Sequence, residues 1–98
     1  MARVEFAERV SDDFDRITLH LLSHGVAEPE ARIAEIVDAC SLLERHPLLG
    51  RSVGPPMREL VIGQGSHGYV VLYQYAAYAD RVDVLAVRSQ REAGYRLD

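Results

Sequence analysis

The spacing of apolar residues changes once along this 98-residue chain, and that change limits the fold more than any single motif. Before Pro47 the apolar residues recur at helical intervals, as Val10, Phe14, Ile17 and Leu21 do. Such intervals place side chains on one face of a helix. After a loop rich in glycine and proline, apolar and polar residues alternate and β-formers dominate, which is the pattern of strands. The chain is therefore expected to have a helical N-terminal half and a C-terminal sheet.

Two helices are expected in the N-terminal half. Gly25 ends the first, since glycine accepts the left-handed conformation that closes many helices. Pro29 begins the second, because the first turn of a helix does not need the N–H that proline lacks, and Pro47 ends it. The short connection predicts an antiparallel hairpin. The second helix is expected to bury a stripe of apolar residues, and the first to turn its charged residues away from the core: Ile33, Ile36, Val37, Cys40 and Leu43 in the stripe, and Asp12, Asp13, Asp15 and Arg16 on the charged side.

The remaining segments are read as strands. Residues 3–6 alternate polar and apolar side chains, as a short half-buried strand does, and three longer strands are expected at MRELVI, YVVLYQY and RVDVLAV. The sequence thus predicts a single α+β domain over residues 1–98. Its expected parts are a short N-terminal strand and an antiparallel helical hairpin, packed on a C-terminal antiparallel sheet of three to four strands.

Charge and cysteine content exclude several classes of function. The net charge is -4, and all eleven basic residues are arginine. Residues 1–50 hold five arginines and ten acids (-5), whereas residues 51–98 hold six arginines and five acids (+1). An acidic surface repels nucleic acid, so direct nucleic-acid binding is not expected. Cys40 alone cannot form a disulfide within the chain or a cysteine-pair metal site. No signal peptide or membrane span is recognised, and a cytoplasmic protein is expected.

The stretch GQGSHGYV, residues 63–70, matches the glycine patterns of kinase loops and of dinucleotide-binding loops. The dinucleotide motif needs a helix directly after the glycines to hold the pyrophosphate, but here a strand follows. The kinase motif needs a lysine, which this chain lacks. The stretch is therefore interpreted as a connection between two strands, and no cofactor is expected.

His20 and His24 stand four residues apart on the first helix, a spacing at which two imidazoles can share a metal ion. A metal site needs at least one more ligand, and none is evident nearby in the sequence. Histidines near the end of a helix also interact favourably with its dipole. No metal site is predicted.

A set of arginines and tyrosines in the C-terminal half is the stronger candidate for function. If the three long strands are neighbours, several members of the set lie on one concave face of the sheet. Arginine and tyrosine side chains there can bind phosphates and stack on bases, or bind an acidic protein surface. The tyrosines at positions 69 and 73 are equally explained as packing residues. The set is Arg58, Tyr69, Tyr73, Arg88, Arg91 and Tyr95.

Four pieces of sequence follow one another along the chain: P-x-x-G-R at residues 47–51, R-E-L-V at 58–61, Y-V-V-L-Y at 69–73, and V-x-V-L-x-V at 82–87 followed by a basic tail. In this order they resemble the ParE/RelE superfamily of bacterial toxin–antitoxin toxins. The resemblance covers nearly the whole chain, and its order and spacing are more specific than any one piece. It implies a small α+β toxin in which a helical hairpin packs on an antiparallel sheet.

The family has two branches with different activities. RelE-type toxins are ribosome-dependent mRNA endonucleases that use lysines and arginines on the sheet and often a C-terminal tyrosine, whereas ParE-type toxins poison DNA gyrase. The RelE pattern has an arginine where this chain has Val70, and the RelE lysines have no counterpart here. Losing one charge-stabilising group typically slows catalysis about 10²- to 10³-fold. The resemblance therefore favours a gyrase inhibitor, with an endonuclease that uses Arg88, Arg91 and Tyr95 as the alternative.

The resemblance also implies partners. A cognate antitoxin is expected to lay a helix on the helical hairpin, and an edge of the sheet is expected to be open to an added strand. The toxin and antitoxin would form a hetero-oligomer, and DNA gyrase would be the target. The expected partner-binding residues are Phe14, Ile17, Leu21, Arg58, Arg88, Arg91 and Tyr95.

Overall fold

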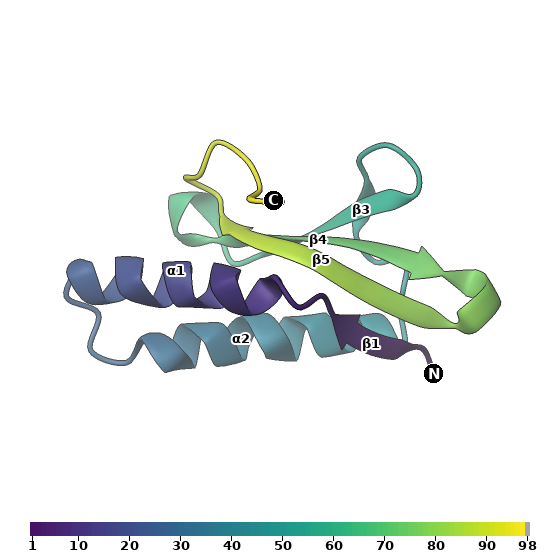
Figure 1. The fold of residues 1–98 in the computed structure, drawn as a ribbon, viewed down its shortest axis with the longest axis horizontal. Coiled ribbons are helices and arrows are strands. Elements are labelled where there is room, and N and C mark those ends of the chain that lie inside the picture. The colour runs from purple at the N-terminus through teal and green to yellow at the C-terminus, as the bar shows by residue number, and fades with distance from the viewer. Residues whose placement is uncertain (98) are drawn as a thin grey trace.

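The computed structural model describes residues 1–97, apart from the side chain of Ser66. A sheet forms the middle layer, with the two helices on one face and the C-terminal tail on the other (Figure 1). The elements, in chain order, are β1 (Arg3–Phe6), α1 (Val10–Ser23), α2 (Pro29–Ser41), the 3₁₀ turn η1 (Leu42–Glu44), β2 (Arg51–Ser52), β3 (Met57–Ile62), η2 (Gly65–His67), β4 (Tyr69–Ala76), η3 (Ala77–Ala79) and β5 (Arg81–Ser89). The predicted α+β architecture and the helical hairpin are confirmed.

The sheet has five strands in the order β1-β5-β4-β3-β2, in which the expected N-terminal strand β1 joins the four C-terminal strands. The three long strands are antiparallel neighbours, as predicted. Two short strands extend them: β1 pairs with β5 in parallel, and the two residues of β2 pair with β3. The sheet is therefore mixed. A two-residue strand is too short to show an alternating pattern, so the sequence did not reveal β2.

The main core lies between the helices and the sheet. Val10 and Ile17 of α1 are buried there, and Phe14 and Leu21 pack partly buried against them. The core also receives the fully buried Ile36 and Cys40 from α2 and Leu43 from η1. The prediction that Val37 is also buried is wrong, because 39% of its surface is exposed. Val37 follows Ile36 by one residue, about 100° around a helix, and so lies at the margin of the stripe.

The prediction that Asp13 lies on the solvent side of α1 is also wrong, because this residue is only 1% exposed. Its carboxylate accepts hydrogen bonds from the backbone N–H of Val87 (2.9 Å) and from the Arg16 guanidinium (2.7 Å). Strand β1 pairs with β5 only as far as Val84, so this edge of β5 has no strand partner at Val87. A buried N–H needs an acceptor, and Asp13, three residues after Val10 on the same helical face, supplies it.

The segment before β2 packs against a buried tyrosine of β4. The Tyr73 hydroxyl accepts a hydrogen bond from the Gly50 backbone N–H at 2.8 Å. A Cβ atom at position 50 would lie 2.6 Å from the Glu59 carbonyl oxygen and 2.7 Å from the Tyr73 ring. Arg58 fixes the same segment by donating to the backbone oxygens of Gly50 (2.7 Å) and Leu48 (3.3 Å). The glycine of the P-x-x-G-R motif is therefore required by packing.

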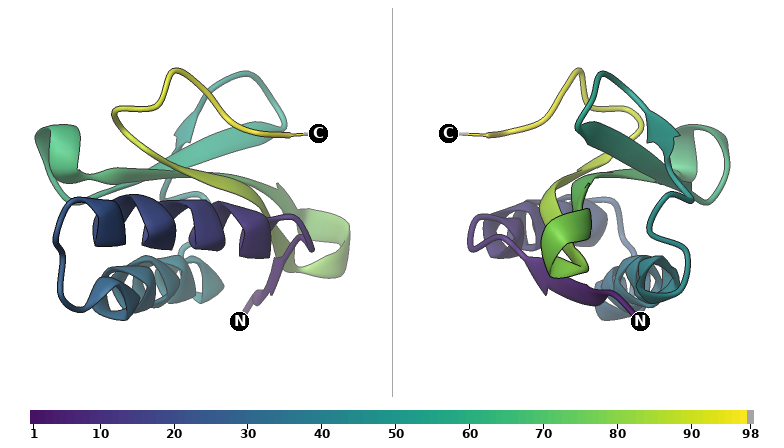
Figure 2. Two further views of the ribbon diagram at one scale, coloured as in Figure 1. Left: turned by 60° about the vertical axis from the view of Figure 1, so that its left-hand side comes forward. Right: turned by 90° about the vertical axis from the view of Figure 1, so that its right-hand side faces the viewer.

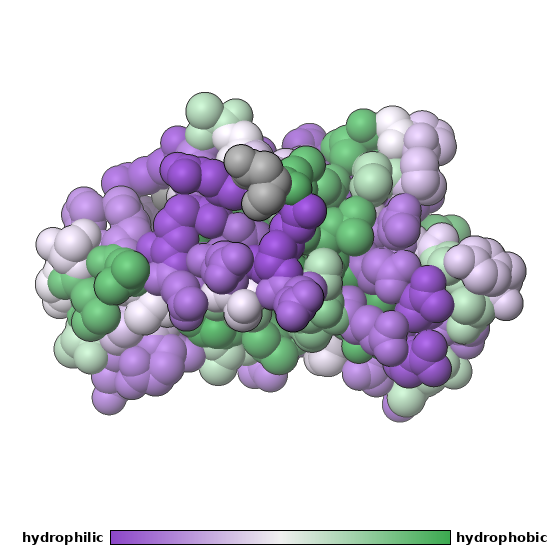
Figure 3. All heavy atoms as spheres, in the orientation of Figure 1, coloured by the Kyte–Doolittle hydropathy of each residue, from purple (hydrophilic) through white to green (hydrophobic). Residues whose placement is uncertain are grey.

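Apolar side chains are exposed at the end of the helical hairpin, where α1 leads into α2 (Figure 3). Leu19 is 67% exposed and Leu22 is 53% exposed, and both lie in the last two turns of α1. Exposed leucines so close together on one helix are candidates for contact with another protein. Neither helix of the described chain is long and apolar enough to cross a membrane.

Candidate functional site

The sheet divides the predicted arginines and tyrosines between its two faces, so several members of the set share a face but the whole set does not. Residues directly opposite each other on paired strands point to the same face. Arg58 pairs with Tyr73, and both belong to the face covered by the helices. Arg88 pairs with Val70 on the other face, which we call the outer face. Side chains alternate between the two faces along a strand, so Tyr69 and Tyr73 of β4 lie on the face opposite to that of Val70.

The outer face is covered by the C-terminal tail, which crosses the sheet on the side away from the helices (Figure 2). Val70, Leu72 and Ala86 lie on this face, and all three are buried, at 4%, 7% and 0% exposure. A polar tail can keep three apolar residues buried only if other contacts hold it on the sheet. A cluster of polar side chains supplies these contacts.

That cluster, which we call the outer-face cluster, consists of Arg51, Glu59, Arg88 and Tyr95. The Tyr95 hydroxyl donates to Glu59 Oε2 at 2.6 Å, and Arg51 donates to Glu59 Oε1 at 3.1 Å. The Arg88 guanidinium lies 5.0 Å from the centre of the Tyr95 ring, within the range of a cation–π contact. Arg88 also donates to two backbone oxygens of the tail, those of Ser89 (3.2 Å) and Glu92 (3.1 Å).

The electrostatics of the outer-face cluster keep its carboxylate ionised and its phenol neutral. Burial alone would raise the pKa of Glu59, but the hydrogen bonds from Tyr95 and Arg51 outweigh burial, and the pKa is lowered. Burial and the bond to Glu59 raise the pKa of Tyr95 above its ordinary value, although Arg88 acts against them. Tyr95 is therefore a proton donor that is already engaged, and it cannot act as a base near neutral pH.

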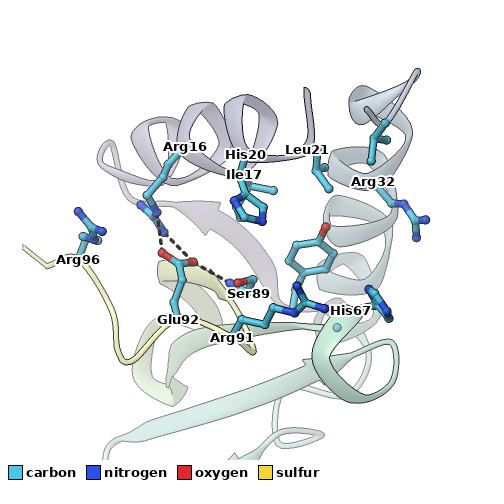
Figure 4. Close-up of a pocket in the computed structure, with 13 residues that line it drawn as sticks. Arg16, Ile17, His20, Leu21, Arg32, His67, Ser89, Arg91, Glu92 and Arg96 are labelled. Atoms are coloured by element: carbon cyan, nitrogen blue, oxygen red, sulfur yellow. Dashed lines mark hydrogen bonds and ion pairs between the residues drawn. The ribbon is translucent and has the colours of Figure 1, made fainter. Parts of the chain in front are cut away.

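The other side of the sheet contains a pocket of about 460 Å³, which we call the hairpin-end pocket. It lies where α1, α2, the start of β4 and the end of β5 meet (Figure 4). Four arginines and two histidines line it over an apolar floor. The lining residues are Arg16, Ile17, His20, Leu21, Val26, Arg32, His67, Gly68, Tyr69, Ser89, Arg91, Glu92 and Arg96. Three predicted partner-binding residues, Ile17, Leu21 and Arg91, are thus brought together here.

One wall of the hairpin-end pocket is an ion pair that ties α1 to the tail. Arg16 donates to Glu92 Oε1 at 2.8 Å, and Glu92 accepts the Ser89 backbone N–H at 2.8 Å (Figure 4). Burial alone would raise the pKa of Glu92, but these two hydrogen bonds prevail and lower it. Arg16 also reaches the Val87 backbone oxygen at 3.1 Å. Residues 89–92 are therefore anchored to the helix layer as well as to the sheet.

The sequence analysis missed several candidate functional residues, of which Glu59 could have been recognised from its position in a strand. Glu59 lies in the R-E-L-V motif between two residues of the helix-facing side, so strand alternation places it on the outer face. A lone acid at such a position indicates a cationic or hydroxyl partner. Arg16, Arg32, Arg96 and Glu92 had no comparable signal, because only the fold brings α1, α2 and the tail together.

The two histidines at the C-terminal end of α1 lie against each other, and His20 also lines the hairpin-end pocket. Their rings are 4.2 Å apart, and Nδ1 of His24 lies 2.9 Å from the backbone oxygen of His20. No group of three histidine, cysteine or acidic side chains within residues 1–97 is arranged to hold a metal ion. The glycine stretch at residues 63–68 joins β3 to β4, as expected, and it contributes His67 and Gly68 to the hairpin-end pocket.

Comparison with known proteins agrees with this fold. The family described as ParE toxin of type II toxin-antitoxin system, parDE, matches residues 4–94. The toxin RelE3 of Caulobacter vibrioides is 33% identical over 92 residues, which cover 94% of this chain and 98% of that protein. The chain therefore belongs to the ParE/RelE superfamily of type II toxin–antitoxin toxins. Membership in this family implies a cognate antitoxin as a partner.

A solved structure supports the fold alone. A mutant of E. coli toxin RelE in the free state superimposes with a TM-score of 0.54 at 19% sequence identity. The match covers 95% of this chain and 88% of that one.

Proposed function

We propose that this toxin acts in the cytoplasm by binding DNA gyrase and blocking the resealing of cleaved DNA, and that a cognate antitoxin holds it inactive. The observation that carries the proposal is the state of the outer face. Its centre is made of Val70, Leu72 and Ala86, and its arginine Arg88 is engaged by Tyr95 and by tail carbonyls. In the endonuclease branch, the corresponding face carries the cationic catalytic groups.

The chemistry of RNA cleavage explains why this outer face argues against a nuclease. Attack of a 2′-hydroxyl on phosphate builds negative charge on the phosphate, and preorganised cations must stabilise that charge. A proton must also reach the leaving oxygen. Here the Tyr95 hydroxyl, the candidate proton donor, already donates to the Glu59 carboxylate at 2.6 Å. The negative charge of Glu59 would also repel a phosphate. The apolar centre is covered by the tail and its arginine is engaged, so this face is poorly suited to hold a phosphate.

A second candidate function is a ribosome-dependent endoribonuclease. It is favoured by one feature of Arg88, whose Nε is buried and has no hydrogen-bond partner among the described atoms. A phosphate oxygen could accept that donor if the tail moved away. Arg88, Arg91 and Tyr95 would then be the catalytic candidates, although Arg91 lines the hairpin-end pocket rather than the outer-face cluster.

Two assays with the purified toxin separate the candidates. In the first, gyrase supercoils relaxed plasmid in the presence of toxin, and detergent and protease are then added to denature and digest the gyrase. We expect supercoiling to stop and linear DNA to accumulate, because resealing is blocked. In the second, the toxin is added to a translating extract and mRNA ends are mapped by primer extension. We expect intact messages.

The variant Tyr95→Phe serves as the matched control in both assays. It removes the phenolic proton donor but keeps the ring beneath Arg88, so a gyrase inhibitor should keep its activity, whereas a nuclease that uses Tyr95 should lose it. Cuts at ribosomal A sites by the wild type, absent with Tyr95→Phe and with gyrase unaffected, would overturn the proposal in favour of the nuclease.

A further inference from the structure

The hairpin-end pocket concentrates positive charge in a chain that is acidic overall. Its four arginines and its single carboxylate, Glu92, sum to +3 with the histidines neutral, whereas the whole chain carries -4. A concave site of one sign focuses its field and attracts ligands of the opposite sign. The pocket is therefore matched to an anionic group.

Two arginines of the hairpin-end pocket differ in how closely they are paired. Arg16 is occupied by Asp13 (2.7 Å) and Glu92 (2.8 Å), so it forms part of the wall. Arg32 of α2 lies 3.9 Å from Glu35, and its side chain is 49% exposed. Arg91 approaches from the strand side and Arg96 from the tail (Figure 4). Arg32, Arg91 and Arg96 are thus spread around the rim, where a carboxylate could accept forked hydrogen bonds.

The floor of the hairpin-end pocket is apolar. Ile17 and Leu21 from α1 and Val26 from the interhelical loop form it, together with the ring of Tyr69. Leu19 and Leu22 do not line the pocket, and they are exposed on another face of α1. A ligand that covers the floor needs an apolar part as well as a negative charge.

We propose that the hairpin-end pocket receives an acidic side chain of the antitoxin, with a neighbouring aliphatic side chain seated on the floor formed by Ile17, Leu21 and Val26. The pocket volume of about 460 Å³ is more than enough for these two side chains. A protein segment is favoured over a small anion because it can place an apolar group on the floor beside the negative charge. The inference rests on the existence of an antitoxin partner and not on the choice of gyrase as target.

The test measures the affinity of the purified cognate antitoxin for toxin variants by calorimetry, at low and at high salt. The double variant Arg32→Gln, Arg91→Gln should weaken binding by about 10- to 100-fold, as expected for lost charge-assisted hydrogen bonds. It should also reduce the dependence of affinity on salt, because fewer charges meet at the interface. Arg45→Gln is the matched control, since Arg45 is exposed beyond the other end of α2 and should leave affinity unchanged within about twofold.

A charge swap distinguishes a direct contact from a structural effect. Each Asp and Glu of the antitoxin is changed in turn to Arg and tested against toxin carrying Arg32→Glu and Arg91→Glu. We expect one such antitoxin variant to regain affinity for the reversed toxin while losing affinity for the wild type.

Equal affinities for the wild type and the double variant would overturn the proposal. So would a loss that appears only for RNA, DNA or inorganic phosphate, because the pocket would then serve a different ligand. Inhibition of gyrase is measured without antitoxin, so a failure of the gyrase proposal leaves this test interpretable.

Discussion

At the scale of single residues, Glu59 is the group on which the outer face depends. It is 8% exposed, and its two carboxylate oxygens are shared between Tyr95 and Arg51. A buried carboxylate is tolerated only when donors replace the water it has lost. Here the donor from the tail is the phenol of Tyr95, so the same contact that stabilises Glu59 also holds the tail on the sheet.

Tyr95→Phe tests this contact through its pH dependence. The folded-state pKa of Glu59 lies below its ordinary value because the bonds from Tyr95 and Arg51 outweigh burial. Ionised Glu59 therefore stabilises the fold above the ordinary glutamate pKa of about 4.3, and this contribution is lost as pH falls through the folded-state pKa. At pH 7 we expect Tyr95→Phe to lower the free energy of unfolding by about 1–2 kcal/mol in urea titrations.

The loss of stability caused by Tyr95→Phe should become smaller as the pH falls below the folded-state pKa of Glu59. The variant Glu59→Gln provides the control, because Tyr95→Phe should cost less in that background and its cost should not depend on pH. The same loss at every pH in both backgrounds would show that the tyrosine acts through packing alone.

At the scale of elements, one buried carboxylate docks α1 on β5. Asp13 occupies the place of a strand partner at Val87, beyond the end of β1. The same carboxylate pairs with Arg16, which continues to Glu92 in the tail. Helix, strand and tail therefore share one chain of hydrogen bonds.

Asp13→Asn should lower the free energy of unfolding by about 2–3 kcal/mol, because it weakens the bond to Val87 and leaves Arg16 without one of its two carboxylate partners. The matched control is Asp12→Asn, one residue away on the exposed side of the same turn, which should change stability by less than about 0.5 kcal/mol. Urea unfolding followed by circular dichroism measures both. Equal effects of the two substitutions would refute the docking role of Asp13.

The contact between the β2 segment and β4 gives a second prediction at this scale. Gly50→Ala would place a Cβ atom 2.6 Å from the Glu59 backbone oxygen, and neither backbone nor the buried Tyr73 can move freely. We expect a loss of about 2 kcal/mol or more in the free energy of unfolding, as is typical of overpacked cores. Gly94→Ala is the control, since nothing lies within 4 Å of its Cβ position. An unchanged thermal midpoint for Gly50→Ala would mean that the segment shifts without cost.

At the scale of the whole molecule, the sheet separates two surfaces with different chemistry. The helix side carries the cationic hairpin-end pocket with its apolar floor, whereas the outer face is closed by the tail over Val70, Leu72 and Ala86. Glu92 links the two surfaces, because it pairs with Arg16 on the helix side while its backbone oxygen accepts from Arg88 on the outer face. A partner that moves the tail would therefore alter both.

The candidate site was only partly predictable. Ile17, Leu21 and Arg91 were named from the sequence, and the structure brings them to one pocket. Phe14 packs partly buried against the core and Arg58 is tied to the carbonyls of Leu48 and Gly50, so neither is in that pocket. A stripe of apolar residues identifies a helix face but does not say which of its members are covered, because that depends on the neighbouring element.

The sequence by itself determined the succession of helices and strands and the family. These follow from local spacing, from turn-forming glycine and proline, and from motif order, which all act over a few residues. Only the tertiary structure decided that β1 pairs in parallel with β5, that Asp13 is buried, and that Arg88 and Arg91 serve opposite faces. The reason is physical: each depends on contacts between segments more than seventy residues apart or on the unpaired edge of a strand, and neither leaves a local periodic signal.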